Sequence, residues 1–546
     1  MIRLGRLSQN LPVLAFLALM GLFLIAPLGE LAAQAFGGPD GRLTLQPFAR
    51  YLAEPGLARA LVNTAVLGVS VTALVLPLAF LVAFTLERSR VPLKGWLQAA
   101  ASTPLLIPSL LPALALVYLF GRQGLLTPLF GGRTIYGFQG VLLADAVAAF
   151  PHALVMLRAA LAAADGRLYE QARLLGSPPW RTFWRVTLPG ARHGLVSAVV
   201  VVFSLTIADV GAPKVVGGGF DVLALDIYKA VIGRQDFQTG AVAALFLLAP
   251  SLVAVAIERL AARRQAALVS SRSTPFTPTK DPRRDLGLGV ASAVIALLIT
   301  GLLGVCQWAA LVKQWPYDLS LSLDQYQLDR FDGGGWSAVT DSVGLGLATA
   351  ALGIVCAFAG AYLAERTRAA KPLRGLVSAA ALAPAATPGL ALGVAYVLFF
   401  NDPANPLHGI YGTFLILVAV TVTHFYTVAH LTSVSALKAL DPEFEAAGRM
   451  LGRGPLALIG RVIGPLSAPA LVELAVYLFV NAMTTVSAVV FLYPPDVKLA
   501  AVAVLNMDDA GDTAAAAAMG MLIVYVNLGA RLLGLAARAW LGRRAA

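Results

Sequence analysis

The chain has 546 residues, of which 58% are hydrophobic and only 13% are charged, and its formal net charge is +12. Soluble domains carry about 25% charged residues, so a chain of this composition cannot cover its apolar surface in water. The composition therefore predicts a membrane protein. It also argues against nucleic-acid binding, because the Arg and Lys residues are grouped in loops between apolar segments, where membrane topology accounts for them.

Twelve apolar segments are long enough to cross a bilayer, whose core of about 30 Å takes roughly 20 helical residues. Helices are expected because backbone groups in lipid must be satisfied within one segment, and the alternating pattern of a membrane barrel is absent. The sequence therefore predicts an all-α membrane protein with about 12 transmembrane helices. In chain order, the segments cover roughly residues 11–35, 57–85, 97–120, 138–160, 194–212, 239–257, 286–312, 338–364, 375–400, 411–436, 470–492 and 513–540.

The first segment resembles a secretory signal, because Arg3 and Arg6 precede it and Ala33–Ala35 resembles a cleavage site. Its apolar run is long, and the matching seventh segment is internal. We therefore expect an uncleaved membrane anchor.

Arg and Lys residues gather in alternate loops, which the positive-inside rule assigns to the cytoplasm. Arg88, Arg90 and Lys94 follow the second segment, for example, whereas Asp221 and Asp226 lie in an opposite loop. Both termini are therefore expected in the cytoplasm.

The chain repeats itself about halfway along. Glu-Arg-Ser-Arg at 87–90 recurs as Glu-Arg-Thr-Arg at 365–368, and Pro104 recurs as Pro384. Each half is expected to hold six spans, and an even number of spans gives two parallel repeats with the substrate path between them.

These observations divide the chain into three parts. Residues 1–257 are the expected first repeat, and residues 286–546 are the second. Residues 258–285 between them are rich in Ser, Thr, Pro and Arg, which is typical of a solvated cytoplasmic linker.

A short cytoplasmic signature occurs once in each half. The first copy reads Tyr-Glu-Gln-Ala-Arg-Leu-Leu-Gly from Tyr169 to Gly176, followed by twelve residues and Pro189. The second reads Glu-Ala-Ala-Gly-Arg-Met-Leu-Gly from Glu445 to Gly452, followed by twelve residues and Pro465. This equal spacing indicates two similar docking sites for a partner on one side of the membrane.

Each copy predicts a short surface helix that an Asp caps and a Gly ends. The caps are Asp165 and Asp441. Glu170 or Glu445 would offer a partner a charged acceptor, and small residues would let its backbone approach closely. The small residues are Ala172, Ala446, Ala447 and Gly448. The alternative is an ordinary amphipathic helix that lies on lipid.

The signature resembles that of permease subunits of binding-protein-dependent ABC importers, in which the loop helix docks in a cleft of a cytoplasmic ATPase. The family pattern is Glu-Ala-Ala, three residues, Gly, nine residues, Ile, one residue and Leu-Pro. Glu170, Ala172, Gly176 and Pro189 match it. The second copy departs from it, because Ala446 stands in the Glu position, Glu445 is one residue early and Gly464 replaces Leu.

The resemblance implies a type I ABC importer permease fold in a bacterial inner membrane. It implies two cytoplasmic ATP-binding subunits, which would bind ATP and Mg²⁺, and a periplasmic substrate-binding protein. The chain itself has no Gly-x-x-x-x-Gly-Lys-Ser/Thr phosphate loop, so we expect no ATP hydrolysis by this subunit and no cofactor or metal of its own.

Polar residues within apolar spans usually face the bundle interior, because they are costly in lipid. Asp209 ends the fifth span, and the eleventh span has Thr485 at the equivalent position. The expected path residues are Asp209, Asn481, Thr484, Thr485 and Ser487. The alternative for Asp209 is that it pairs with Lys214 or caps a turn.

The stretches that begin at Asp209 and at Asn481 look more like the 2-aminoethylphosphonate permeases than the ferric-iron ones. We therefore expect 2-aminoethylphosphonate as the solute, with ferric iron or thiamine as alternatives. A different class, an ion-coupled secondary transporter with twelve helices, would explain the repeat but not the paired loop signatures.

The charge asymmetry predicts that Ser271 is cytoplasmic and that Asp402 and Asp496 are periplasmic. Single cysteines at 402 and 496, in a chain without Cys306 and Cys356, should react with an impermeant reagent in intact cells. A cysteine at 271 should react only after permeabilisation, and labelling of 271 in intact cells would overturn the topology.

Overall fold

The computed structural model describes residues 2–38, 42–266, 274, 276–367, 369–441 and 443–545. Residues 267–273 of the expected linker, and Ser271 with them, lie outside the described residues. Within the described part, ten helices are long and apolar enough to cross a membrane, and one bent helix pair would make an eleventh.

Thirteen α-helices lie in the described residues of the first half. They are α1 (Ile2–Met20), α2 (Ala26–Phe36), α3 (Gln46–Ala53), α4 (Pro55–Arg88), α5 (Lys94–Ala101), α6 (Leu110–Phe120), α7 (Phe138–Ala162), α8 (Gly166–Leu174), α9 (Pro179–Thr182), α10 (Leu188–Ala208), α11 (Gly211–Val216), α12 (Leu223–Tyr228) and α13 (Phe237–Ala266).

The second half repeats this order. Its helices are α14 (Pro282–Leu311), α15 (Gly335–Glu365), α16 (Lys371–Ala380), α17 (Gly389–Phe400), α18 (Phe414–Lys438), α19 (Glu443–Met450), α20 (Pro455–Leu458), α21 (Gly464–Thr484), α22 (Ala500–Asp509) and α23 (Thr513–Ala545). A small antiparallel hairpin, β1 (Val312–Gln314) and β2 (Asp318–Leu321), follows α14. Helices α13 and α14 run further into the expected linker than residues 257 and 286.

Short π and 3₁₀ turns complete the chain. The π turns are η1 (Gly21–Ile25), η4 (Phe183–Thr187), η5 (Lys229–Gly233) and η10 (Ile459–Ile463). The 3₁₀ turns are η2 (Thr103–Leu106), η3 (Thr127–Phe130), η6 (Asp324–Tyr326), η7 (Leu328–Arg330), η8 (Pro384–Ala386) and η9 (His408–Ile410).

The predicted spans at 97–120 and 375–400 are not single continuous helices. The first is divided into α5, η2 and α6, and the second bends by 106° before α17. Proline explains both breaks, because it disfavours the helical conformation in the residue before it. Ile107 and Thr387, which precede Pro108 and Pro388, have extended backbones.

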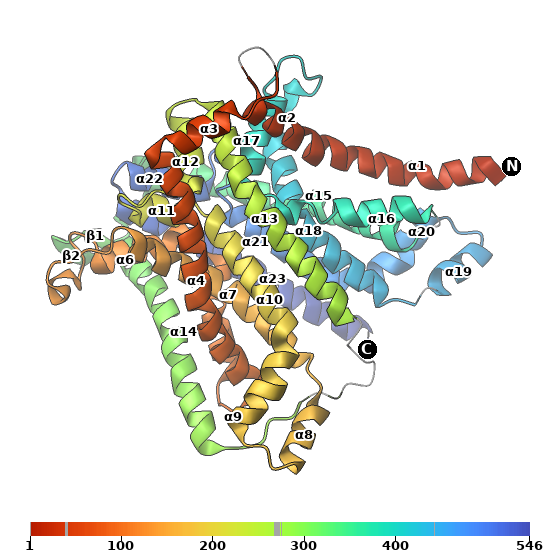
Figure 1. The fold of residues 1–546 in the computed structure, drawn as a ribbon, viewed down its shortest axis with the longest axis horizontal. Coiled ribbons are helices and arrows are strands. Elements are labelled where there is room, and N and C mark those ends of the chain that lie inside the picture. Colours follow the sequence, from red (N-terminus) through yellow and green to blue (C-terminus); the bar gives the residue numbers. More distant parts are fainter. Residues whose placement is uncertain are drawn as a thin grey trace.

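The fifth and eleventh spans end earlier than predicted. Their helices stop at Ala208 and Thr484, although the apolar segments continue to 212 and 492. The chain then forms short helices, α11 and α12 in the first half and α22 in the second. These helices lie together at one end of the molecule, whereas α8, α19 and the C-terminus lie toward the other end (Figure 1).

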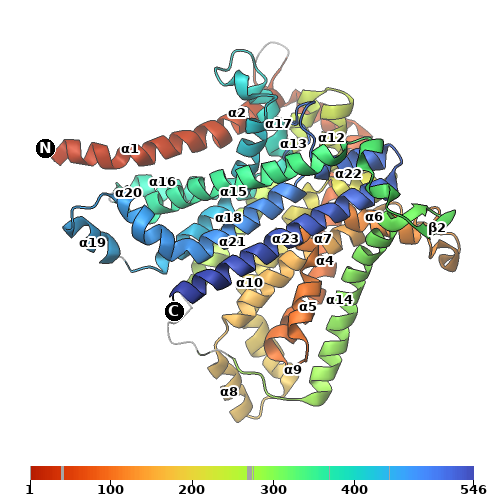
Figure 2. The same cartoon turned by 180° about the vertical axis from the view of Figure 1, so that it is seen from behind.

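Each half lends its first helix to the other half (Figure 2). Helix α2 packs on α17, and the Tyr396 hydroxyl donates a hydrogen bond of 2.7 Å to the carbonyl of Phe23. Helix α14 packs on α5 and α6, where the Cys306 thiol donates to the carbonyl of Leu111 at 3.3 Å. These exchanged helices and the core shared by both halves join the repeats.

Candidate coupling loops and translocation path

We call α8 and α19 the loop helices, because they carry the repeated signature. The Asp165 carboxylate caps α8 by accepting a hydrogen bond of 3.0 Å from the backbone N–H of Arg167. The Asp441 carboxylate accepts one of 2.9 Å from Glu443 at the start of α19. Both Asp residues therefore satisfy helix N–H groups that have no partner within the helix, as predicted.

The two glycines end the loop helices in the same way. Gly176 has φ of 64° and Gly452 has φ of 66°. The next N–H bonds back five residues in each case, from Ser177 to Ala172 and from Arg453 to Gly448, at 2.9 Å. This is a Schellman motif, whose left-handed residue is usually glycine. An added Cβ at either glycine has no atom within 4 Å, so the backbone angle and not crowding requires glycine.

The signature prolines also have a structural role. Pro189 and Pro465 lie in the first turns of α10 and α21, directly after the π turns η4 and η10. Proline clashes with the carbonyl four residues before it, and a wider turn relieves that clash. The loop chain therefore runs into the next long helix without a break, over residues 179–208 and 455–484.

An arginine at equivalent places in the two halves anchors each loop helix. Arg88 is 3% exposed and donates to the carbonyl of Leu161 at 2.5 Å, at the end of α7. Arg366 donates to the carbonyls of Leu437 and Leu440, the latter at 2.6 Å, at the end of α18. Each guanidinium thus ties the end of one long helix to the carbonyls that precede a loop helix.

The two arginines differ in the side chain of the loop helix that each one contacts. Arg366 pairs with the Glu445 carboxylate at 3.2 Å, and both side chains are nearly buried. Tyr169 occupies the equivalent position in the first half, where its hydroxyl accepts from Arg88 at 3.3 Å. Glu170, in contrast, is exposed.

Three of the residues expected to contact a partner already have contacts within this chain. The Glu445 carboxylate pairs with Arg366. Ala172 and Gly448 are buried within their own loops, and a Cβ at Gly448 would lie 3.0 Å from Leu458. Of the expected contact residues, Glu170, Ala446 and Ala447 are exposed. An ion pair between residues 79 positions apart explains why Glu445 stands one residue early in the signature.

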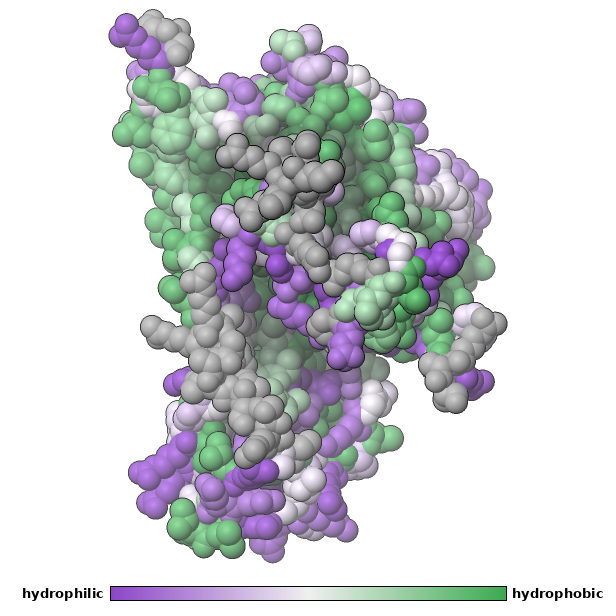
Figure 3. Space-filling model, turned by 90° about the vertical axis from the view of Figure 1, so that its right-hand side faces the viewer, coloured by the Kyte–Doolittle hydropathy of each residue, from purple (hydrophilic) through white to green (hydrophobic). Residues whose placement is uncertain are grey.

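The sequence analysis did not predict that the apolar residues before Gly176 and Gly452 are exposed. The two residues before each glycine are almost fully exposed: Leu174 and Leu175 at 86% and 85%, Met450 and Leu451 at 83% and 77%. The signal was present, since both signatures end in two apolar residues and Gly. Figure 3 views the molecule from the side of α19 and the C-terminus, where hydrophilic residues gather between hydrophobic flanks.

Asp209 caps a turn, and it does not pair with Lys214. Its carboxylate accepts a hydrogen bond of 2.8 Å from the N–H of Ala212, at the start of α11. The Ser109 hydroxyl and the buried Asp145 carboxyl lie beside it. Lys214 instead pairs with Asp509 at 2.8 Å, which joins the first half to the second.

The expected path residues of the second half are held mainly by their own helix. The Asn481 amide donates to the carbonyl of Tyr477 at 2.8 Å, and the Thr484 hydroxyl donates to that of Val480 at 3.0 Å. Thr485 is nearly buried and follows the last residue of α21. Ser487 lies against Gly389 at the start of α17.

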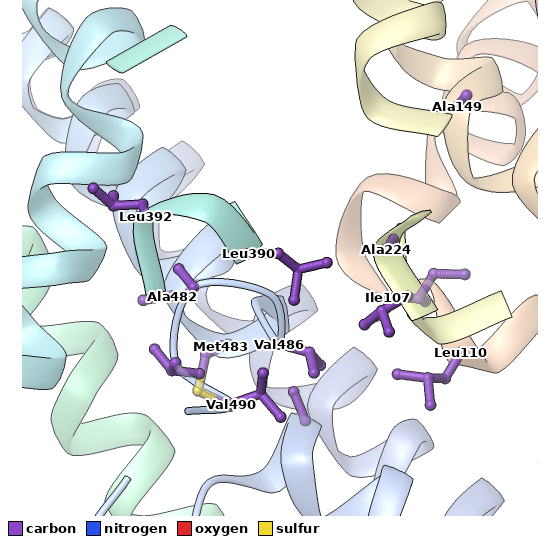
Figure 4. Packing of buried hydrophobic residues seen from close by; sticks show 14 of the residues in the cluster. Ile107, Leu110, Ala149, Ala224, Leu390, Leu392, Ala482, Met483, Val486 and Val490 are labelled. Carbon is purple, nitrogen blue, oxygen red and sulfur yellow. The ribbon is translucent and has the colours of Figure 1, made fainter. Parts of the chain in front are cut away.

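An apolar layer lies where the halves meet. Leu390, Val486 and Val490 of the second half lie opposite Ile107 and Leu110 of the first, and all belong to one buried cluster (Figure 4). Leu110 and Leu390 are equivalent in the repeat. Composition alone did not indicate that these aliphatic residues, and not the polar ones, fill the junction.

A polar pocket lies at the α12/α22 end, beside the Lys214–Asp509 pair. It has a volume of about 660 Å³ and is lined by Glu54, Lys214, Asp221, Asp226, Tyr228, Lys229 and Arg234, among others. The Lys214 ammonium also lies 4.1 Å from the Tyr228 ring centre. Burial, with the nearby Asp221 carboxylate, raises the pKa of Asp226 to about 6, so this acid is still largely ionised at neutral pH.

Comparison with known proteins identifies the family of the chain. The family model of the binding-protein-dependent transport system inner membrane component matches residues 75–267 and 343–540, so it occurs once in each half. The chain belongs to this family. As an inner membrane component of such a system it is a multi-pass membrane protein with the fold of an ABC importer permease, built as two fused repeats.

Relatives of this inner membrane component differ in the substrate that they are named for. The ferric transport system permease protein FbpB of Actinobacillus pleuropneumoniae is 27% identical over 505 residues, which cover 88% of this chain and 71% of that protein. The putative 2-aminoethylphosphonate transport system permease protein PhnU of Salmonella typhi is 29% identical over 262 residues, which cover 46% and 90%. The sulfate permease CysW of Synechococcus elongatus is 29% identical over 266 residues, which cover 46% and 90%. The family match favours an importer permease over an ion-coupled secondary transporter.

The turn geometry predicts different effects for two substitutions at Gly176. Gly176→Val should disrupt the end of α8, because a left-handed conformation costs a branched residue roughly 1–2 kcal/mol. Gly176→Asn should be tolerated, since Asn adopts this conformation more readily. The measurement is co-purification of the ATPase and substrate-stimulated ATP hydrolysis in liposomes. Normal values for Gly176→Val would show that the turn is not needed.

Glu445→Ala should reduce the stability of the chain, whereas Glu170→Ala should reduce its binding to the ATPase. Loss of Glu445 leaves Arg366 without its partner, and breaking a buried pair costs on the order of 3 kcal/mol, so the unfolding temperature should fall. Glu170→Ala removes an exposed group, so it should leave that temperature unchanged and weaken ATPase binding. Equal unfolding temperatures for the two variants would contradict the assigned pairing.

The Lys214–Asp509 pair predicts a charge-swap rescue. Lys214→Asp or Asp509→Lys should loosen contact between the halves and raise ATP hydrolysis in the absence of binding protein. Asp509 is half exposed, so the effect should not exceed roughly fivefold. The double swap should restore the basal rate, and a double variant that stays at the single-variant rate would reject the pair.

Proposed function

We propose that this inner membrane component is the permease subunit of an ATP-driven importer that moves 2-aminoethylphosphonate from the periplasm to the cytoplasm by alternating access. Two cytoplasmic ATP-binding subunits dock on α8 and α19, and a periplasmic binding protein delivers the solute. ATP and Mg²⁺ bind to the partner subunits, and this chain hydrolyses nothing. Both of its termini face the cytoplasm.

The duplicated loop helix is the main support for the docking proposal. Both loop helices are capped and ended in the same way, and both present two exposed apolar residues beside the final glycine. Exposed apolar residues on a rigid element are typical of a protein interface. Because each loop chain continues into a long helix, movement of a docked ATPase would be carried into α10 and α21.

The junction of the halves supports the alternating-access part. The apolar layer of Figure 4 and the Lys214–Asp509 pair join the halves toward the α12/α22 end, which is the periplasmic end in the proposed topology. Opening toward the periplasm would separate these groups. A rigid-body change of this kind needs a ligand that binds one state better, and the docked binding protein and ATP supply that difference.

The cargo proposal is supported by sequence likeness and by the different chemistry of the two halves. Asp145 and Asp209 are acids, whereas the equivalent positions of the second half are Thr421 and Thr485. Acids suit an ammonium group, and hydroxyls can donate to a phosphonate, so a small zwitterion matches this arrangement. The likeness to PhnU is a further support.

Ferric iron is the second candidate. The observation that favours it is the match to FbpB, which extends over most of this chain and hence over both halves. Ferric iron prefers several hard oxygen ligands, and the Asp145 and Asp209 carboxyls supply some of them.

The test is uptake in a host that lacks phosphonate and ferric importers and expresses the chain with its cognate ATPase and binding protein. Radiolabelled 2-aminoethylphosphonate should accumulate, and Asp209→Asn should reduce its uptake without loss of assembly, because Asn keeps an acceptor for the Ala212 N–H and loses the charge.

If radiolabelled iron is taken up and radiolabelled 2-aminoethylphosphonate is not, the proposed cargo is rejected and ferric iron takes its place. Full uptake by Asp209→Asn would reject the role of that carboxylate alone. A complex that takes up neither solute and copurifies with no ATPase would reject the docking proposal.

A further inference from the structure

The linker between the halves does more than connect them. Its described residues between α13 and α14, 274 and 276–281, lie against the first loop helix and against Arg88 and Arg90 at the end of α4. The Thr274 carbonyl accepts a hydrogen bond of 2.8 Å from the N–H of Gly166, the first residue of α8. The Thr274 hydroxyl and N–H both donate to the Asp165 carboxylate at 3.3 Å. The linker thus completes the cap of this helix.

An aromatic residue of the linker contacts the arginine that anchors α8. The Phe276 ring lies 4.6 Å from the Tyr169 ring centre, and the Arg88 guanidinium carbon lies 4.6 Å from the Phe276 ring centre. The same guanidinium lies 5.0 Å from Tyr169. Arginine stacks favourably on aromatic faces, and this stack is partly withdrawn from water. Phe276 therefore helps to hold Tyr169 against Arg88.

The linker is fixed at its other end as well. Arg90 donates to the carbonyl of Pro278 at 2.7 Å, and Arg284 donates to that of Thr279 at 2.8 Å. Arg284 is in the first turn of α14, which packs on α4 and α5. The segment therefore runs as a brace from the first helix of the second half to the first loop helix.

The second loop helix, α19, is held by a different interaction. Arg366 is the counterpart of Arg88, and Glu445 is the counterpart of Tyr169. The Glu445 carboxylate pairs directly with Arg366 in a nearly buried contact. One half therefore holds its loop helix with an ion pair. The other half holds it with two aromatic rings, tilted by 56° to each other, that both contact Arg88, and one of these rings comes from the linker.

We propose that linker residues 274 and 276–281 are a positioning element that holds α8 in its docking orientation, with Phe276 as the principal contact. This inference rests on the proposed function only in that α8 is taken as an ATPase docking site. The brace makes the first docking site depend on the linker, whereas the second depends on the Arg366–Glu445 pair.

The test compares the mobility of the two loop helices in the full-length chain in liposomes. Spin labels are placed singly at Leu174→Cys on α8 and Met450→Cys on α19, both exposed positions, after Cys306 and Cys356 are replaced by Ala. Phe276→Ala should increase the mobile component of the label at 174 and leave the label at 450 unchanged. Glu445→Gln should do the reverse.

Two matched variants control for general damage to the linker. Phe276→Tyr keeps the stacked ring and should restore the immobile spectrum at 174. Thr277→Ala removes the side chain of an exposed neighbour and should have no effect. Equal spectra for Phe276→Ala and Thr277→Ala at position 174 would overturn the proposal, as would equal changes at 174 and 450.

The spectra do not require a partner, so they test the brace independently of the transport function. Co-purification of the ATPase with Phe276→Ala provides the second readout, and the proposal expects it to fall while Thr277→Ala retains it. If the wild-type chain binds no ATPase at all, the proposed function fails, and the spectra still decide whether the brace exists.

Discussion

The contact between a buried arginine and the carbonyls at the end of a long helix is the constraint on which both loop helices depend. Arg88 and Arg366 lie at the ends of α4 and α15 and donate to the ends of α7 and α18. Backbone carbonyls at a helix end have no partners within the helix, so a guanidinium with several donors satisfies them well. A loop helix that follows such an end starts from a fixed point on the long helices.

Both halves have this contact between an arginine and the carbonyls at a helix end, but the other side chains around the arginine differ. The ion pair of one half is replaced by aromatic rings in the other. A similar exchange occurs where α6 and α17 begin: Ser109 lies against Gly211, and Gly389 lies against Ser487, so the hydroxyl comes from opposite members of the equivalent pair. The volume at each contact is thereby kept, because only one of the two residues carries a side chain. The repeats can therefore diverge in chemistry while their backbones stay alike.

The sequence was sufficient for the membrane class, the repeat, the caps at Asp165 and Asp441 and the helix ends at Gly176 and Gly452, because each follows from local spacing or composition. It was not sufficient for contacts between distant residues. Hydropathy made Pro388 part of one straight span, although the residue before a proline avoids the helical conformation. Nothing local shows that Glu445 pairs with Arg366 or that α2 packs on α17, since these contacts depend on how the halves assemble.

The central claim is that α8 and α19 are rigid docking helices that move with the two halves. The most direct measurement is the distance between spin labels at Leu168→Cys and Phe444→Cys, which are exposed positions outside the proposed docking residues, in one chain assembled with its ATPase subunits in liposomes. Trapping the ATP-bound state should shorten this distance, because closing ATPases would draw the two loop helices together. A distance distribution that is the same with and without bound ATP, in complexes that hydrolyse ATP, would contradict the account.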